Sequence, residues 1–193
     1  MTNETPEQIV KEMQDLVGNL KLSYFFTRTG LKTILNNVNN MILTPENPNP
    51  TVWMGKGDPN DPTSISYGGW PKSLTQMNLA DGGTVDLLLG MQLVVFLYSL
   101  WDIDYRPRLA AAHGCGKNDI KIPMLGDLRR FRNDMVHNRA IASTKYTARC
   151  EVLKWFAEGD LIAIVGDRIH ELTVAIPWDD LLAAPVSDTR GDQ

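Results

Sequence analysis

Three residues of one short run, Arg132, Asn133 and His137, carry side chains that could together act on an RNA phosphodiester. RNA has its own nucleophile, the ribose 2′-hydroxyl beside the scissile phosphate. Cleavage therefore needs a base for that hydroxyl, an acid for the leaving 5′-oxygen and positive charge near the phosphorane oxygens. One histidine and one arginine per chain supply part of that set, and two chains related by a two-fold axis would supply two of each.

These side chains need a helix to hold them, and Pro123 predicts the start of a helix that runs to about Asn138. At about 100° per residue its apolar residues form one stripe: Leu125, Leu128, Met135 and Val136, with Phe131 at the edge. Arg132 falls inside this stripe, where a guanidinium needs a carboxylate or an anionic ligand because an unpaired buried charge is costly. Asp102 or Asp104 could be that partner, and Arg132 would then be structural.

Asn133 and His137 are four residues apart and share a second face of the predicted helix. His137 lies in the last turn, where the helix dipole favours a positive charge. A histidine that only caps the helix would occupy the same position, so a structural role for His137 stays open.

Further cations surround this run. Residues 121–149 contain seven Lys or Arg and two Asp, a local net charge of +5; because the whole chain carries −4, the remainder carries −9. This asymmetry indicates an anionic partner for one face, although a solvated helix face would give the same count. The cations expected to follow an RNA backbone are Arg106, Arg129, Arg130 and Arg139.

The sequence indicates no metal site and no cofactor. No carboxylate cluster for a metal pair is visible, which argues against a two-metal nuclease. His113-x-Cys115 has no second pair of ligands, so it does not predict a zinc site.

The pattern formed by Arg132, Asn133 and His137 resembles the Arg-x4-His motif of the HEPN superfamily (higher eukaryotes and prokaryotes nucleotide-binding). The resemblance covers roughly residues 85–156, with a long apolar helix before the motif helix and, at residues 105–108, a Tyr-Arg-Pro-Arg segment found in bacterial members. It implies a homodimer with metal-independent endoribonuclease activity. In such an enzyme Arg132 and His137 are catalytic, and Asn133 is the polar residue that often follows the arginine.

Some features depart from this family. HEPN toxins often carry a tyrosine two positions after the histidine, where this chain has Arg139, so a cognate antitoxin is left open but not indicated. A non-catalytic RNA- or nucleotide-binding module and a dimeric scaffold are the alternatives to a ribonuclease of stress response or defence. The run from Arg108 to His113 has the spacing of the motif without its context, and no function is assigned to it.

The expected fold is mainly α: a HEPN-like up-and-down helical bundle with a long Pro/Gly-rich insertion and a short C-terminal β-hairpin. A single domain of residues 1–184 fits a chain of 193 residues that is 43% hydrophobic, and residues 185–193 are expected to form a flexible polar tail. Thr5, Pro6 and Gln8 predict a capped helix start.

Towards the C-terminus, a helix is expected over residues 144–158. The hairpin is expected over residues 160–177, around a Gly166-Asp167 turn with glycine in the position that a type II′ loop requires.

The insertion spans residues 44–83, and its prolines, Trp53 and Trp70 predict an ordered flap. It could be a lid over a dimer cleft or a cover for the apolar helix at Val85 to Trp101. That helix is apolar nearly all round, which is typical of a helix buried in a bundle or at a dimer seam. With a polar N-terminus and cysteines too far apart in sequence for a Cys-x-x-Cys pair, the chain is expected to be cytoplasmic, with no membrane partner.

Overall fold

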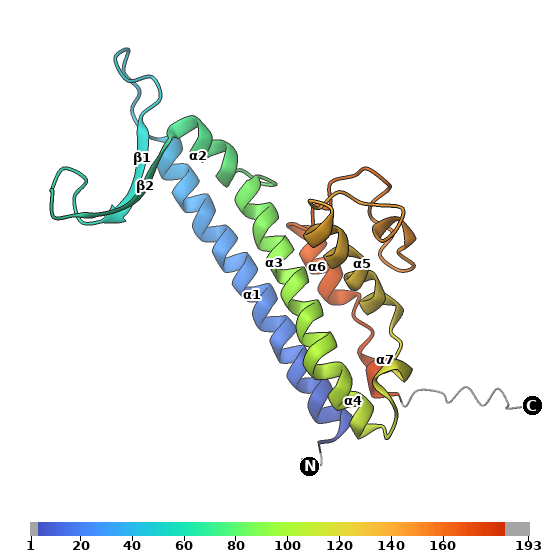
Figure 1. The fold of residues 1–193 in the computed structure, drawn as a ribbon. Coiled ribbons are helices and arrows are strands. Elements are labelled where there is room, and N and C mark those ends of the chain that lie inside the picture. The colour runs from blue at the N-terminus through green and yellow to red at the C-terminus, as the bar shows by residue number, and fades with distance from the viewer. Residues whose placement is uncertain (1–3, 184–193) are drawn as a thin grey trace, which may run out of the picture. The chain divides into compact units, whose positions relative to one another are not determined.

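The computed structural model describes residues 4–183, and the tail predicted at 185–193 lies outside the described residues. The fold is mainly α-helical, as expected (Figure 1). The chain divides into two compact units: Tyr24–Leu89 forms one, and the residues up to Ser23 together with those from Gly90 onward form the other.

The first helix, α1 (Pro6–Asn39), begins with the predicted capping box. The N–H of Thr5 donates to Oε1 of Gln8 at 3.0 Å, and the N–H of Gln8 donates to Oγ1 of Thr5 at 3.4 Å. These two bonds satisfy backbone donors that the first helical turn leaves free. The helix then continues unbroken through Gly18 and Gly30.

The insertion is structured, and it contains the only β-ladder within residues 4–183. Strands β1 (Thr51–Lys56) and β2 (Ile65–Pro71) pair antiparallel, and α2 (Lys72–Leu79) follows directly. Buried Lys72 donates to the carbonyl oxygens of Asn39 and Met41 at 3.1 and 3.0 Å, and so satisfies carbonyls at the C-terminal end of α1. The prediction of an ordered segment is therefore confirmed.

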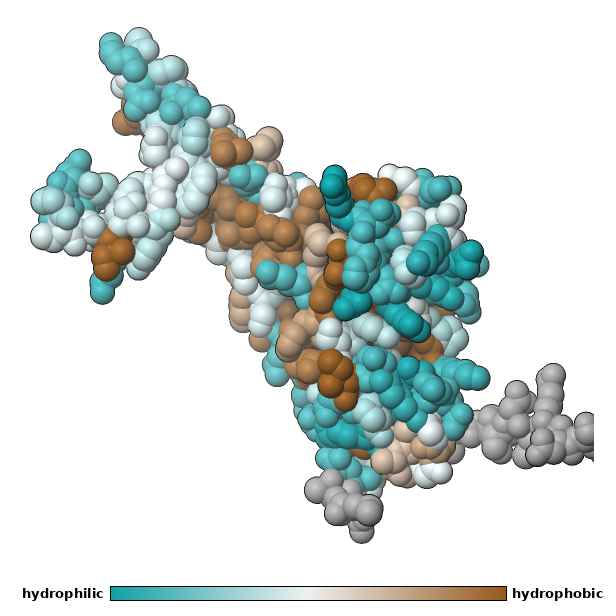
Figure 2. All heavy atoms as spheres, viewed as in Figure 1, coloured by the Kyte–Doolittle hydropathy of each residue, from teal (hydrophilic) through white to brown (hydrophobic). Residues whose placement is uncertain are grey.

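The tryptophans of the hairpin lie along its strands rather than in a core. A Cβ at Gly55 would collide with the ring of Trp53, and one at Gly68 would lie 2.7 Å from the ring of Trp70. Both rings line an apolar groove of ≈ 580 Å³ within this unit, together with residues of α1 and Val85. Figure 2 shows apolar surface gathered at the base of the hairpin. Trp70 remains 41% exposed, so it does not plug a core.

Helix α3 (Thr84–Leu100), which enters the other unit at Gly90, continues through a π-helical turn, η1 (Trp101–Tyr105), into α4 (Arg106–Ala112). Proline in a helix interior commonly kinks or ends the helix, but here the helix continues through Pro107. Pro107 has no N–H to donate to the preceding turn, and the N–H of Arg106 bonds instead to the carbonyl of Trp101, five residues back. The wider turn accommodates the proline within one helical run.

Within the single chain, the run formed by α3 and η1 is buried on one face only: Leu97 and Trp101 are buried, whereas Phe96 is 48% and Ile103 is 76% exposed. Burial on all sides within a bundle is therefore wrong, and the alternative of a dimer seam stays a prediction. The stretch Lys72–Ala112 is long and apolar enough to cross a membrane by length and composition alone, and 28% of its most apolar window is buried.

The C-terminal β-hairpin predicted over residues 160–177 is also wrong. Gly166 does adopt a positive φ of 55°, but the chain then enters α6 (Asp167–Val174), followed by α7 (Trp178–Leu182). Ile169, Leu172 and Ile176 are buried at helical spacing, whereas Val174 is 66% exposed. A period of 3.6 residues, not of 2, places the apolar side chains of this segment in the core.

Between α4 and the C-terminal helices lie η2 (Lys117–Asp119), α5 (Pro123–His137) and η3 (Thr147–Arg149). The helix predicted over residues 144–158 is wrong, because only the short η3 forms there. Two buried carboxylates of α5 bind the backbone of this segment. Asp127 accepts the N–H groups of Glu151, Val152 and Leu153 at 3.0, 2.7 and 2.8 Å.

Asp134 repeats this arrangement two turns further along α5. It accepts the N–H and the hydroxyl of Ser143 at 2.9 and 2.7 Å, and the N–H of Thr147 at 3.0 Å. Both aspartates have no exposed surface. Amides that donate to these carboxylates cannot donate to helical carbonyls, so the segment follows α5 as an irregular chain.

Burial raises the pKa of the Asp127 carboxyl, but hydrogen bonds from three backbone amides and from Arg130 outweigh it and hold the pKa below its ordinary value. Burial likewise raises the pKa of Asp134, and the bonds from Ser143 and Thr147 lower it further than burial raises it. Both groups are therefore charged in the folded protein at neutral pH.

We expect Asp127→Ala to lower the free energy of unfolding by about 3–5 kcal/mol, because it leaves three amides and the guanidinium of Arg130 without their acceptor. Asp15→Ala is the matched control, since Asp15 only forms an exposed i,i+4 pair with Lys11 and should change stability by less than about 1 kcal/mol. Urea unfolding followed by circular dichroism measures both. Equal losses in the two variants would contradict the anchoring role of Asp127.

Acid should destabilise the protein through the same carboxylates. Because folding lowers the pKa of Asp127 and Asp134, the unfolded chain binds protons first as the pH falls. The stability that these two carboxylates contribute is complete above about pH 5. It is lost as the pH falls through the ordinary carboxyl range near 4 towards the pKa values of the folded protein. Urea midpoints measured from pH 7 to 3 should fall most steeply below about pH 4. In Asp134→Asn protein the urea midpoint should fall less steeply with pH than in wild type. An unchanged slope would show that Asp134 is not a source of the acid sensitivity.

Candidate functional site

The buried face of α5 differs from the predicted stripe in two residues. Leu125, Leu128 and Met135 are buried as expected, but Phe131 is fully buried rather than at the edge, and Val136 is 49% exposed. Phe131 packs against the rings of Trp155 and Phe156, with centroids 6.0 and 5.6 Å away, and these contacts centre the buried face on Phe131. Arg132 consequently lies half-buried at the edge of this face instead of inside it.

Arg132 does not form the ion pair with Asp102 or Asp104 that a structural role would require. Its Nη1 donates to Oδ1 of the adjacent Asn133 at 3.2 Å. Asp102 is paired with Arg106 and Lys117 at 3.4 and 3.1 Å, and Asp104 is paired with Arg108 at 3.0 Å. Within residues 4–183, neither Arg132 nor Arg129 has a carboxylate at ion-pair distance.

Both arginines open into a polar cleft of ≈ 440 Å³, called here the arginine cleft. Its walls come from α3, η1, α4, η2 and α5. The residues that line it are Tyr98, Ser99, Asp102, Ile103, Arg106, Lys117, Asn118, Arg129, Arg132 and Asn133. Four cationic side chains therefore face a single carboxylate, and the cleft favours an anionic ligand.

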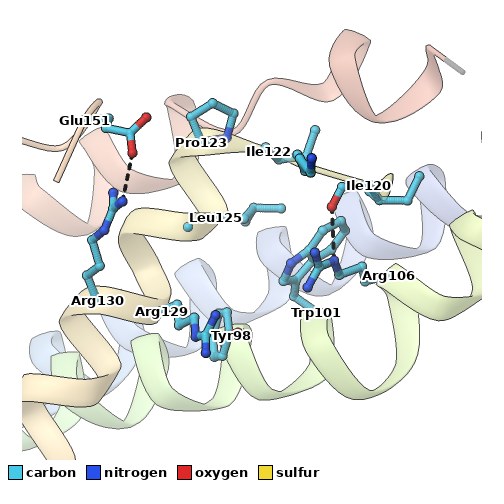
Figure 3. Close-up of a pocket in the computed structure, with 12 residues that line it drawn as sticks. Tyr98, Trp101, Arg106, Ile120, Ile122, Pro123, Leu125, Arg129, Arg130 and Glu151 are labelled. Atoms are coloured by element: carbon cyan, nitrogen blue, oxygen red, sulfur yellow. Dashed lines mark hydrogen bonds and ion pairs between the residues drawn. The ribbon is translucent and has the colours of Figure 1, made fainter. Parts of the chain in front are cut away.

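A second hollow of ≈ 390 Å³, called here the adjoining pocket, shares Tyr98, Arg106 and Arg129 with the arginine cleft. Figure 3 shows these three side chains with the apolar residues of the pocket. The guanidinium of Arg106 donates to the carbonyl of Ile120 at 3.1 Å, which holds the 120–122 segment against η1 and α4.

Tyr98 is a residue of this site that the sequence did not reveal. Burial raises the pKa of its hydroxyl and the charge of Asp102 raises it further, whereas Arg129, Arg106 and Arg132 lower it. The net shift is upward, so the hydroxyl stays protonated near the three arginines and can donate a hydrogen bond. The only sequence signal for Tyr98 was its i,i+4 spacing from Asp102. Because α3 is mostly apolar, Tyr98 was not distinguished from the core residues around it.

The structure separates the two adjacent arginines of α5. Arg130, predicted to contact RNA, donates from Nη1 to Asp127 at 2.6 Å and from Nη2 to Glu151 at 2.8 Å. Its charge is therefore used within the fold. Arg129, one residue earlier, is exposed and turned towards the arginine cleft.

His137 and Arg139 lie outside the set of residues that line the arginine cleft. His137 is exposed at the end of α5, on the same strip as Asn133 and about 6 Å further along the helix axis. Within one chain the structure thus brings together Arg106, Arg129, Arg132 and Asn133, and it leaves His137 one turn beyond them.

The chain reverses immediately after His137 through two residues in the left-handed region. Arg139 and Ala140 have φ values of 52° and 59°, a conformation that costs a non-glycine residue roughly 1–2 kcal/mol. The N–H of Ala140 donates to the carbonyl of Asp134 at 3.1 Å, and the Asp134 side chain holds Ser143. This anchored turn fixes where α5 ends and so fixes the position of His137.

The second run with the motif spacing, Arg108 to His113, makes its contacts within the fold. Arg108 pairs with Glu4, Glu12 and Asp104 at 2.7, 2.6 and 3.0 Å, and these carboxylates raise its pKa. His113 lies 3.4 Å from the carbonyl oxygen of Leu181, on another helix. Arg108 is thus neutralised by acids, whereas Arg132 is not.

Among the described residues, no group of three or more His, Cys, Asp or Glu side chains is placed to hold a metal ion. Comparisons of the chain with protein-family models, with curated proteins and with solved structures found no match. The chemistry of the arginine cleft is therefore inferred from its own side chains.

The three arginines of α5 should respond differently to truncation. Arg130→Ala removes the cation paired with buried Asp127 and should lower the free energy of unfolding by about 2–3 kcal/mol. Arg129→Ala and Arg132→Ala break no ion pair and should each change it by no more than about 0.5 kcal/mol. Urea titrations of the three variants test this order. A loss for Arg132→Ala as large as that for Arg130→Ala would make Arg132 a structural residue.

Proposed function

We propose that this protein binds RNA in the arginine cleft and cleaves it without a metal ion, as a homodimeric endoribonuclease of the HEPN type. The observation that supports this most is the pair Arg129 and Arg132, which face a cleft without a carboxylate partner among the described residues. Guanidinium groups in that position, one exposed and one half-buried, favour a phosphate ligand, which accepts two parallel N–H bonds from one arginine.

In this proposal each side chain has a defined role. Arg132 stabilises the charge that develops on the phosphorane oxygens, Asn133 orients the phosphate, and Arg129 and Arg106 hold the adjacent backbone. His137 acts as the base that takes the proton of the ribose 2′-hydroxyl and as the acid that protonates the leaving 5′-oxygen.

Because His137 does not line the cleft of its own chain, the proposal places it at the cleft of a second copy. Ile103 lines the arginine cleft and is 76% exposed, and Phe96 is exposed two turns earlier along the same helical run. These apolar side chains offer surface that dimerisation would bury. A two-fold axis near α5 would then supply two arginines and two histidines to one composite site.

A non-catalytic RNA- or nucleotide-binding module is the second candidate. The position of His137 outside the lined cleft favours it, because a single chain then binds phosphate without placing a proton-transfer group beside it. The two candidates share the arginines and differ only in what His137 does.

We expect the protein to cleave structured RNA in excess chelator and to leave DNA of the same sequence intact, because DNA lacks the 2′-hydroxyl nucleophile. His137→Ala should abolish cleavage while retaining RNA binding. Arg132→Ala should weaken both binding and cleavage, and should flatten the salt dependence of binding, because one phosphate contact is lost. Lys11→Ala, an exposed change on α1, is the control and should behave as wild type. Gel-based cleavage and binding assays read out all four proteins.

Mixing tests whether the site is shared between chains. Co-expressed Arg132→Ala and His137→Ala chains form mixed dimers that retain one intact pairing of arginine and histidine, so part of the cleavage activity should return. Binding by wild type without any cleavage would reject the ribonuclease and leave the binding module. Cleavage that never returns on mixing would place Arg132 and His137 in the same protomer.

A further inference from the structure

The adjoining pocket differs in chemistry from the arginine cleft beside it. Its walls are mainly apolar and aromatic, with Tyr98, Trp101, Ile120, Ile122 and Leu125, and its volume of ≈ 390 Å³ falls in the range of small-molecule sites. Figure 3 shows Tyr98 and Trp101 on one wall, with Leu125 and the 120–122 segment around them. Charged residues, Arg106, Lys121, Arg129, Arg130 and Glu151, complete the lining, so the pocket suits a flat ring that carries polar groups.

A glycine near the start of α5 leaves space on one side of this pocket. Gly126 lines the pocket, and a Cβ added there would meet no atom within 4 Å. Glycine destabilises a helix interior relative to alanine, and here no close packing requires it. Alanine would support the helix better, but at this position of α5, which lines the pocket, the chain has no side chain.

The two hollows adjoin each other and share part of their lining. Tyr98, Arg106 and Arg129 belong to both, so a phosphate held by the arginines lies next to the aromatic wall. A nucleotide matches this arrangement, because its anionic phosphate is joined through a sugar to a flat ring. Bases of unpaired RNA are commonly held by stacking on aromatic side chains beside a basic groove.

The rim of the pocket carries a hydrogen-bond acceptor. Glu151 lines it, and its Oε1 accepts from Nη2 of Arg130 at 2.8 Å, which fixes the carboxylate in place. Oε2 of Glu151 has no hydrogen bond to the described residues. A carboxylate at this position accepts from the amino group of a base, as Glu and Asp do from the N4 amino group of cytosine.

We infer that the adjoining pocket is a base-recognition site, which takes one unpaired nucleobase bearing an amino group while the phosphate of that nucleotide occupies the arginine cleft. The inference rests on the proposed function in that it takes a nucleotide as the ligand, but it does not require cleavage. It assigns Gly126 the role of leaving space, half-buried Tyr98 that of stacking surface, and Glu151 that of selecting the base.

Calorimetric titration of the full chain with cytidine 5′-monophosphate, uridine 5′-monophosphate and ribose 5-phosphate tests this assignment. The cytidine nucleotide should bind at least about fivefold more tightly than ribose 5-phosphate, the smallest gain expected from stacking one base. It should also bind more tightly than the uridine nucleotide, which has the same ring size but no amino group. Glu151→Gln should reduce the preference for cytidine over uridine.

Gly126→Leu fills the pocket without breaking an ion pair, and should lower the affinity for both nucleotides to that for ribose 5-phosphate. The affinity for ribose 5-phosphate itself should not change, because the arginines remain. Gly18→Leu is the matched control: Gly18 is an exposed helical glycine of α1 with equally open space at its Cβ, and its variant should bind as wild type. Circular dichroism of both variants verifies that the helices are retained.

Several results would overturn the inference. Wild-type protein that binds ribose 5-phosphate as tightly as the nucleotides has no base site, and Gly126→Leu protein that keeps the nucleotide preference places the base elsewhere. The ribonuclease proposal fails separately. Selective nucleotide binding without RNA cleavage supports the pocket and rejects the nuclease, whereas RNA cleavage by Gly126→Leu protein with unchanged base preference rejects the pocket and retains the nuclease.

Discussion

Two charges buried on the inner face of α5 organise the part of the chain around the candidate site. Asp127 and Asp134 are seven residues apart and therefore share one face of the helix. Each binds several amides of the segment between residues 143 and 153, which has little secondary structure of its own. A helix and an irregular segment are thus joined by charge-assisted hydrogen bonds, and an apolar contact centred on Phe131 lies between the two anchors.

The same arrangement explains why only some cations of α5 are free. Asp127 and Asp134 occupy the inner face of α5, and Asp127 binds Arg130. Arg129 and Arg132 lie at the opposite edge and have no acid partner among the described residues. The π-helical turn contributes the facing wall. It lets the helical run continue through Pro107, and Asp102 in this turn binds Arg106 and Lys117, so the one carboxylate in the arginine cleft is already satisfied. The positive potential of the cleft follows from how ion pairs are distributed, not from the net charge of the chain.

Local patterns in the sequence were sufficient where short-range interactions decide the structure. The capping box at Thr5, the proline at the start of α5 and the helical spacing of its apolar residues all act within one or two turns, and each is present in the structure. The cationic run also contains Arg129, Arg132 and Asn133, which line one cleft in the structure, and their functional roles stay predictions.

Long-range interactions account for the parts that the sequence could not predict. Residues 144–158 have helical periodicity, but carboxylates more than nine residues away in sequence take many of their amides. Arg129 and Arg130 are identical in type, and only the position of Glu151 and Asp127 in space decides that one is structural. The β-strands fell in the insertion rather than after Gly166, because Ile169 and Leu172 find buried contacts as a helix. Tyr98 joined the site through tertiary packing alone.

The Asp127 anchor also determines the thiol chemistry of the chain. Cys150 is buried directly before the amides that Asp127 binds, and burial together with that carboxylate raises its pKa to about 12. At physiological pH it is therefore almost entirely a thiol, and because reaction requires the thiolate it is protected against alkylation and oxidation. Cys115, the other cysteine of the chain, is half-buried after α4, two residues before Lys117 of the arginine cleft. The native protein thus offers one partly exposed thiol close in sequence to its candidate site, a place for a spectroscopic label that would report on ligand entry without any engineered cysteine.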